Sequence, residues 1–264
     1  MEMFVGYVAS GLIGISLGLI GGGGSIITIP VLVYLFHIEP TLATAYSLFI
    51  VGATSLVGGI RCAFNKMVDV RSALLLAVPS TVGVYLTRHF VLPHIPDTIL
   101  VMNDFSLTRD SALMLFFAVI MVIAALRMIR DKKIDEQTPA TQHNFMLIPI
   151  VGLLVGIITG IVGAGGGFLI IPPLVLFVGL PMKRAVATSL VIIAINSLIG
   201  FVGDFSLVRE INFPLLFILS GLSIGGVFFG TYLSRFIKGK SLKWGFGWFA
   251  LIMAVIIVIN ELAI

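Results

Sequence analysis

Two glycine clusters contain the residues of this sequence that are best suited to bind a ligand through the backbone. The first lies in GGGGSIITIP at residues 21–30, and nearly the same text returns as GAGGGFLIIP at residues 163–172. Glycine lets other atoms approach peptide N–H groups closely. A helix that begins there presents free N–H donors and a partial positive charge, so each cluster predicts an anion-binding helix start. The predicted donors are Gly23, Gly24 and Ser25 in the first copy and Gly165, Gly166 and Gly167 in the second.

Hydroxyl and amide side chains follow each cluster at matching distances. Ser47 and Thr54 are seven residues apart, as are Ser189 and Asn196, and residues at this spacing share one face of a helix. If that face lines a cavity, these side chains hydrogen-bond to substrate oxygens; the alternative is that they hydrogen-bond between helices. We predict all four as substrate ligands.

Charged residues at the ends of the predicted segments are candidates for controlling access. Arg61 and Asp204 end corresponding segments, while Lys183 and Arg184 begin the segment after the second cluster. We predict an access or gating role for these four residues. The alternative for the two basic residues at 183 and 184 is that they set orientation and contact lipid headgroups.

The elements that position these residues must be membrane helices. Of the 264 residues, 59% are hydrophobic and 11% are charged, whereas a soluble domain carries about 25% charged residues. The mean hydropathy is +1.17. Alternating segments of the outer-membrane barrel type are absent from the sequence. The fold class predicted is therefore an all-α polytopic membrane protein in a lipid bilayer.

The apolar runs predict ten membrane segments in two sets of five. They lie near 4–20, 24–36, 41–60, 71–90, 110–129, 145–162, 166–179, 183–202, 213–236 and 243–262. The chain thus divides into a first repeat at 1–126, a cytoplasmic linker at 127–144 and a second repeat at 145–264. Segments 24–36 and 166–179 are too short to cross a core of roughly 30 Å. They are expected to be broken or re-entrant helices.

The two sets form an internal repeat. A shift of 142 positions superposes Pro30 on Pro172 and Ser47 on Ser189 without a gap. Tyr46 departs from this match because Thr188 stands at its place in the second copy. Further along, YLTRHF from Tyr85 is similar to YLSRFI from Tyr232.

Close helix packing is the alternative explanation for the glycine clusters, because small residues let helix backbones approach. For Gly11, Gly14 and Gly18, which lie on one helix face, packing is the better interpretation.

An odd number of segments in each half makes the two repeats inverted. Lysine and arginine gather at 61–71, in the linker, at 183–184 and at 235–243, which all fall on one side under this count. The positive-inside rule makes that side cytoplasmic. Both termini are then predicted outside the cytoplasm, in a multi-pass protein of the cell membrane.

Several function classes are disfavoured by the residues. Neither cluster continues into a dinucleotide-binding or P-loop motif. The basic residues behind the net charge of +4 are interpreted as setting the orientation of the chain in the membrane, so no nucleic-acid partner is expected. The histidines are expected in loops, and an anion is expected to be held by backbone donors rather than by a buried cation. We expect no metal, no cofactor and no enzymatic activity. The histidines are His37, His89, His94 and His143.

The motifs LGLIGGGGSIITIPVLV with ATAYSL, and GAGGGFLIIPPLVL with AVATSL, resemble the TauE/SafE family of sulfite and organosulfonate exporters. The resemblance covers essentially the whole chain. It implies transport of a small sulfur-containing anion such as sulfite, thiosulfate or an organosulfonate. Together with the inverted repeat, it predicts a secondary transporter that exports its substrate by alternating access. The alternatives are an anion channel or a transporter of another small anion.

Overall fold

The computed structural model describes residues 2–94, 98–102, 105–130, 147–162, 167–204, 211–234, 236–237 and 239–262. In this part of the chain the fold is helical except for one short β-hairpin. The first half contains α1 (Glu2–Ile20), α2 (Gly23–Phe36), α3 (Pro40–Phe64), α4 (Val70–Leu86), η1 (Thr87–Val91), η2 (Leu92–His94), β1 (Thr98–Met102), β2 (Phe105–Thr108) and α5 (Arg109–Arg130). The second half contains α6 (Leu147–Val162), α7 (Gly167–Leu176), α8 (Met182–Gly203), α9 (Phe213–Leu233) and α10 (Gly239–Leu262).

Four of the described helical stretches are long and apolar enough to cross a membrane: Pro40–Phe64, Val70–Val91, Met182–Gly203 and Phe213–Leu233. Shorter apolar helices accompany them, including Val5–Ile20 and Leu147–Val162. Large apolar side chains also cover the outside of the helices, as at Leu74, Val78 and Val82 along α4, which suits contact with lipid rather than water. The structure is that of a polytopic helical membrane protein.

The predicted segments correspond to helices with small shifts at their ends. The helix α5 continues to Arg130, which is four residues into the predicted linker, and residues 131–146 lie outside the described part. The antiparallel pair β1–β2, in which Met102 lies opposite Phe105, was not among the predicted elements. Its strands are only five and four residues long, and the segment count treated this region as a connection.

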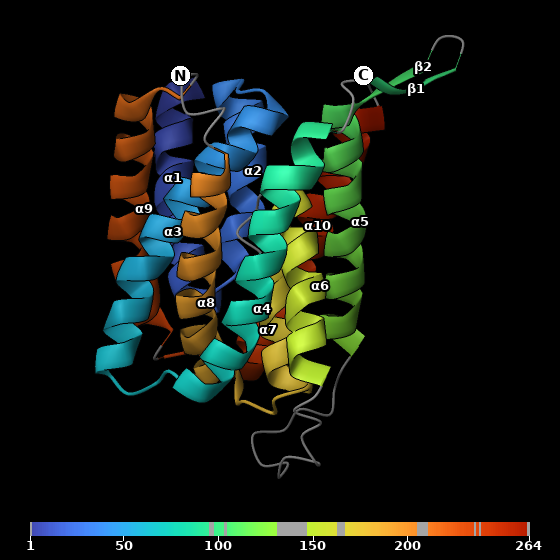
Figure 1. The fold of residues 1–264 in the computed structure, drawn as a ribbon. Helices are drawn as coiled ribbons and strands as arrows, with labels where there is room; N and C mark the ends of the chain where they lie inside the picture. The colour runs from blue at the N-terminus through green and yellow to red at the C-terminus, as the bar shows by residue number, and fades with distance from the viewer. Residues whose placement is uncertain are drawn as a thin grey trace.

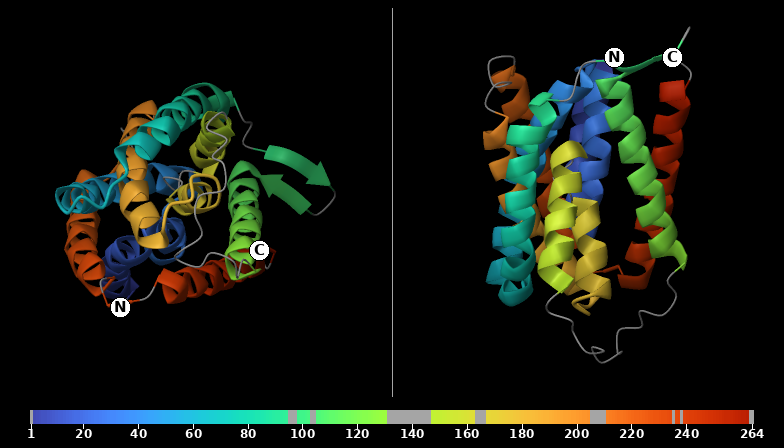
Figure 2. Two further views of the ribbon diagram at one scale, coloured as in Figure 1. Left: turned by 90° about the horizontal axis from the view of Figure 1, so that it is seen from below. Right: turned by 45° about the vertical axis from the view of Figure 1, so that its right-hand side comes forward.

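The helices stand side by side in one bundle, with both chain ends at the same end of it (Figure 1). Each of the main contacts joins one helix from each half: α1 packs on α9, α4 on α6, α3 on α8 and α5 on α10. The last pair forms one edge of the bundle (Figure 2). The two halves are therefore interleaved and do not form separate bodies.

Glycines bring the helix pairs α1–α9 and α4–α6 close together. A Cβ atom on Gly14 would meet the backbone of Ser223, and one on Gly18 would lie 2.6 Å from the backbone nitrogen of Thr231. The other pair repeats this arrangement, since Gly156 lies against the backbone of Ser80. The packing expected for Gly14 and Gly18 is confirmed. Gly11 differs: a Cβ there would meet nothing within 4 Å, although its carbonyl oxygen lies against Gly226.

Adjacent glycines on α9 offer a matched test of this packing. Gly226→Ala would place a Cβ 2.9 Å from the backbone nitrogen of Ile15, so we expect a loss of about 1–3 kcal/mol in the free energy of unfolding. Gly225→Ala meets nothing within 4 Å, and we expect no loss because alanine is the better helix former. Thermal unfolding of the two variants in detergent checks this. Equal melting temperatures would contradict the packing interpretation.

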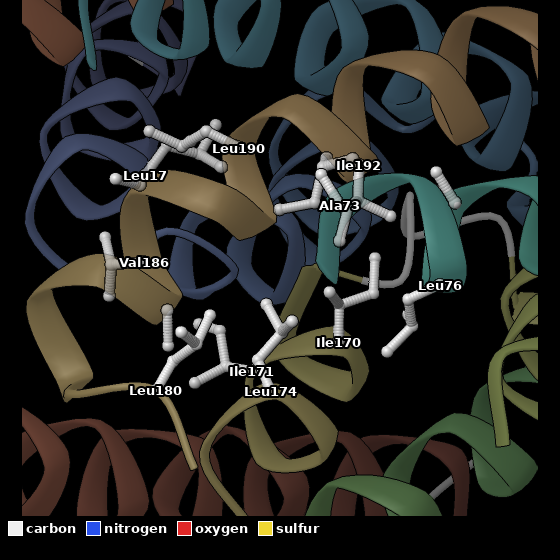
Figure 3. Close-up of a cluster of buried hydrophobic side chains, with 14 of the residues drawn as sticks. Leu17, Ala73, Leu76, Ile170, Ile171, Leu174, Leu180, Val186, Leu190 and Ile192 are labelled. Atoms are coloured by element: carbon white, nitrogen blue, oxygen red, sulfur yellow. The ribbon is translucent and has the colours of Figure 1, made fainter. Parts of the chain in front are cut away.

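The short helix α7 is held by apolar packing. It has ten residues and contains Pro172 and Pro173, so its own hydrogen bonds stabilise it little. It belongs instead to a large buried apolar cluster, whose residues labelled in Figure 3 come from α1, α4, α7, α8 and the connection before α8. This packing determines where the first residue of α7, Gly167, lies. The residues labelled in the figure are Leu17, Ala73, Leu76, Ile170, Ile171, Leu174, Leu180, Val186, Leu190 and Ile192.

Candidate functional site

The starts of α2 and α7 meet inside the bundle. A Cβ on Gly167, the first residue of α7, would lie 2.6 Å from the Cα of Gly22, the residue that precedes α2. It would also lie 3.2 Å from the Oγ of Ser25. The predicted ligands Gly165 and Gly166 lie outside the described residues. The two glycine motifs, although 142 positions apart in the sequence, thus place two helix starts in contact.

The first cluster uses glycine for two physical reasons. Gly21 turns the chain between α1 and α2 with φ +72°, a conformation that side chains disfavour. The Oγ of Ser189 also lies 2.7 Å from the position that a Cβ on Gly21 would take. A Cβ on Gly24 would meet Leu17 and the carbonyl oxygen of Ile13 on α1. The glycines therefore allow the tight turn between α1 and α2 and leave room for the serine side chain of α8.

Some of the hydrogen-bond donors at the start of α2 already have acceptors within the protein. The hydroxyl of Ser25 donates to the carbonyl oxygen of Gly22 at 2.6 Å, and its N–H bonds the same oxygen at 3.2 Å. Ser25 was predicted as a ligand, but in this structure it closes its own turn. Gly23 and Gly24 are the first two residues of α2, and N–H groups in the first turn of a helix have no acceptor inside that helix.

The four predicted side-chain ligands are all fully buried and fall into two groups. The hydroxyls of Ser47 and Thr54 on α3 have no hydrogen-bond partner in the structure. Ser189 on α8 donates to the carbonyl oxygen of Val186 at 2.9 Å. The amide of Asn196 bonds α4, where it accepts from Thr81 at 2.7 Å and donates to Ser80 at 2.9 Å. Among these four side chains, the two without a hydrogen-bond partner therefore both lie on α3.

Unpartnered buried hydroxyls call for an explanation, because such groups are rare and each costs about 1–3 kcal/mol. Ser55 and Ser197 share this condition with Ser47 and Thr54. The helices α3 and α8 touch at this level, since a Cβ on Gly52 would lie 3.2 Å from the Cβ of Ser197. A group of unsatisfied donors therefore lies where one helix from each half crosses the other.

Tyr46 and Thr188, the residues at which the two repeats differ, have matching contacts. The hydroxyl of Tyr46 accepts a hydrogen bond from the backbone N–H of Asn212, the N-cap of α9, at 2.6 Å. The hydroxyl of Thr188 accepts one from the backbone N–H of Asp69, the N-cap of α4, at 3.0 Å. Each satisfies a backbone donor just before a helix of the other half. The two residues differ in the length of the side chain that reaches the backbone donor. Both side chains stabilise the start of a helix in the other half.

The residues predicted to control access lie in two kinds of place. Lys183 and Arg184 are exposed near the start of α8. At the end of α3, Arg61 donates to the carbonyl oxygen of Phe228 at 3.3 Å and to the hydroxyl of Thr231 at 3.2 Å, both on α9. Asp204, just after α8, is buried and pairs with Arg88. Arg61 and Asp204 thus each join the ends of helices from different halves.

Arg88 is a buried cation that the sequence analysis did not single out. It lies in η1 within the apolar stretch Val70–Val91, and its side chain is 0% exposed. His89 also lies in η1, stacked on Tyr85 with 5.5 Å between ring centroids, so its placement in a loop was wrong. The signal was present in the similarity of YLTRHF to YLSRFI, which aligns Arg88 with a second arginine, Arg235. Neither arginine was predicted as a site residue.

The buried helix starts, set between interleaved halves of an apolar bundle, define a polytopic membrane protein with a polar centre, the class to which transporters belong. The family model described as sulfite exporter TauE/SafE matches residues 7–257. The protein therefore belongs to the TauE/SafE family and is a membrane transporter.

Relatives from distant organisms agree with this class. A probable membrane transporter protein of Xylella fastidiosa (strain 9a5c) is 30% identical over 249 residues, which cover 89% of this chain and 86% of the relative. The probable membrane transporter protein YunE of Bacillus subtilis (strain 168) is 29% identical, with 90% of this chain and 89% of the relative covered. No solved structure matches the chain significantly. The relatives are thus similar along most of their length.

Proposed function

We propose that this protein is a secondary transporter that exports small sulfur-containing anions, such as sulfite, thiosulfate or organosulfonates, by alternating access. One observation carries the proposal: two glycine-rich helix starts touch at Gly22 and Gly167 inside the bundle, in a fold with the unpartnered hydroxyls of Ser47 and Thr54 on α3. N–H donors and hydroxyls of this kind suit an anion. The proposed ligands are Gly23, Gly24, Ser25, Gly165, Gly166, Gly167, Ser47, Thr54, Ser189 and Asn196.

Alternating access is proposed to arise from two inverted repeats, residues 1–126 and 145–264. The pairing of the helices supports this, because exchanging the halves converts the pair α1–α9 into α6–α4 and leaves α3–α8 and α5–α10 as they are. The reciprocal contacts of Tyr46 and Thr188 follow the same exchange. Rocking of one half against the other would open the centre to each side in turn.

We propose an orientation for the protein and, separately, a driving force for export. The ends of α3 and α8 that carry Arg61 and Lys183 lie away from the chain termini (Figure 1), so the positive-inside rule places the termini outside the cytoplasm. A potential that is negative inside drives an anion outward by about 2.3 kcal/mol per charge for each 100 mV. No coupling ion is required. A reporter fused to the C-terminus checks the orientation, and cytoplasmic activity of that reporter would contradict it.

Flux from proteoliposomes tests the proposed substrate and site. The purified protein is compared with a variant carrying Ser47→Ala and Thr54→Ala, using sulfite, thiosulfate and methanesulfonate against phosphate and chloride. Both hydroxyls are unpartnered, so their removal should leave the free energy of unfolding unchanged or raised. Hydrogen bonds to a charged group contribute about 1.5–3 kcal/mol each, and we expect the flux of sulfur anions to fall at least tenfold.

Ser220→Ala is the matched control, since this buried serine bonds only the carbonyl oxygen of Leu216 on its own helix among the described contacts. We expect its flux to equal that of the parent. Saturable flux selective for sulfur anions supports the proposal. Unsaturated flux with single-channel steps would favour the channel, selectivity for phosphate would favour another anion, and equal flux in the double variant would remove α3 from the site.

A further inference from the structure

The guanidinium of Arg88 carries N–H groups that have no acceptor and that take no part in the anion site proposed above. Its Nη1 donates to a carboxylate oxygen of Asp204 at 2.6 Å and to the hydroxyl of Thr44 at 3.1 Å. Its Nε and Nη2 are buried and have no hydrogen-bond partner in the structure. These two nitrogens share one edge of the planar guanidinium, the edge that binds two oxygens of one ligand side by side.

The contacts of Nη1 hold that free edge in place. The carboxylate of Asp204 and the hydroxyl of Thr44 come from α8 and α3, whereas Arg88 belongs to η1 at the end of α4. A guanidinium bound from two other helices has little freedom to rotate. Buried N–H donors without an acceptor are costly, so an arrangement that maintains two of them on a charged group points to an acceptor that arrives from elsewhere.

Exchanging the two halves does not reproduce this cluster. In the internal repeat, Val186 stands at the place of Thr44 and Cys62 at the place of Asp204. Neither residue can supply a carboxylate or a hydroxyl. Elsewhere the halves keep equivalent contacts, as Tyr46 and Thr188 do. The Arg88 cluster therefore marks one end of the molecule, the end at which α4 finishes and the chain termini lie (Figure 1).

Three polar side chains lie along one face of α3 that begins at this cluster. Thr44, Ser47 and Thr54 lie three and seven residues apart on α3 and share one face of that helix. The first bonds Arg88, and the other two are buried and unpartnered. One face of α3 thus runs from the level of the α3–α8 contact to the guanidinium.

We propose that Arg88 forms a second oxyanion site, which binds a small anion with at least two oxygens through Nε and Nη2 as it passes between the central helix starts and the end that carries the termini. The site rests on the transport function proposed above. Asp204 and Thr44 orient the guanidinium, and Asp204 repels the bound anion so that its release stays fast. Chloride has no pair of oxygens to match the two parallel donors, so it gains less from them than an oxyanion does.

Calorimetric titration of methanesulfonate and chloride into the purified full-length protein tests the proposal. The background is Ser47→Ala with Thr54→Ala, which weakens the central site and leaves the second. We expect this background to bind methanesulfonate, and Arg88→Lys in it to weaken that binding at least tenfold, because an ammonium lacks the paired donors. Chloride binding should change less than twofold.

A second variant shows whether a loss of binding is due to misfolding. Arg88→Met with Asp204→Leu removes both charges together, and replacing a buried ion pair by apolar residues usually preserves the fold. We expect a single gel-filtration peak, an unchanged melting temperature and the same loss of methanesulfonate binding. Asp204→Asn, which keeps the fork and removes the repulsion, should strengthen binding at least threefold.

Two results would overturn the second site: no methanesulfonate binding in the background, or unchanged affinity in both Arg88 variants. Flux distinguishes this failure from failure of the proposed function. Selective sulfonate flux by the parent together with unchanged affinity in the Arg88 variants rejects Arg88 alone. Absence of any sulfur-anion flux by the parent rejects the transport proposal itself.

Discussion

Gly167→Ala is expected to reduce anion flux to background while the protein still folds. The new Cβ would lie 2.6 Å from the Cα of Gly22 and 2.8 Å from the Cδ1 of Ile193, distances that atoms in contact do not adopt. The backbone of Gly22 belongs to the turn before α2 and has no flexible side chain that can move aside. The two helix starts must therefore separate, which removes the paired donors that we propose hold the anion.

Flux from proteoliposomes and gel filtration of the same preparation check this prediction. Gly245→Ala on α10 is the control, because a Cβ there meets nothing within 4 Å, and its flux should equal that of the parent. A Gly167→Ala protein that transports normally would show that contact between the helix starts is dispensable. The proposed anion site would then have to lie elsewhere.

Arg88→Met alone is expected to lower the free energy of unfolding by about 3–5 kcal/mol, because it leaves the Asp204 carboxylate buried without its partner. Asp204 is 4% exposed, so water cannot replace the guanidinium without local opening. Adding Asp204→Leu should restore the stability of the parent, since no unpaired charge remains. The effect of the pair of changes would then be smaller than that of the first change.

Thermal unfolding of the two variants and the parent in one detergent measures this difference. Arg61→Met is the comparison, since Arg61 bonds only α9 groups at 3.2–3.3 Å in the described contacts and its loss leaves no buried carboxylate. We expect a change below about 1 kcal/mol for this partly exposed residue. Equal stability of Arg88→Met and the parent would mean that Asp204 is solvated or protonated when alone.

Much of the architecture was predictable from the sequence. Long apolar runs bounded by polar residues determine where helices can cross lipid, because unsatisfied backbone groups are excluded from the hydrocarbon. The predicted segment at 183–202 accordingly corresponds to the helix Met182–Gly203. The glycine clusters likewise indicated short helices, and α2 and α7 have 14 and 10 residues. The family was also identifiable from these motifs.

The contacts of the individual polar residues could not be predicted before the packing of the helices was known. Asn196 and Thr54 occupy equivalent places in the repeat, yet the amide bonds α4 while the hydroxyl is unpartnered. Arg88 and Asp204 are 116 residues apart and pair because α4 and α8 pack together. A hydrogen bond or an ion pair depends on the distance between two side chains, and for helices far apart in sequence only their packing sets that distance. By contrast, the segments that are apolar enough to cross a membrane and the places where short helices begin could be predicted from the sequence, since those properties depend on local hydrophobicity and backbone freedom.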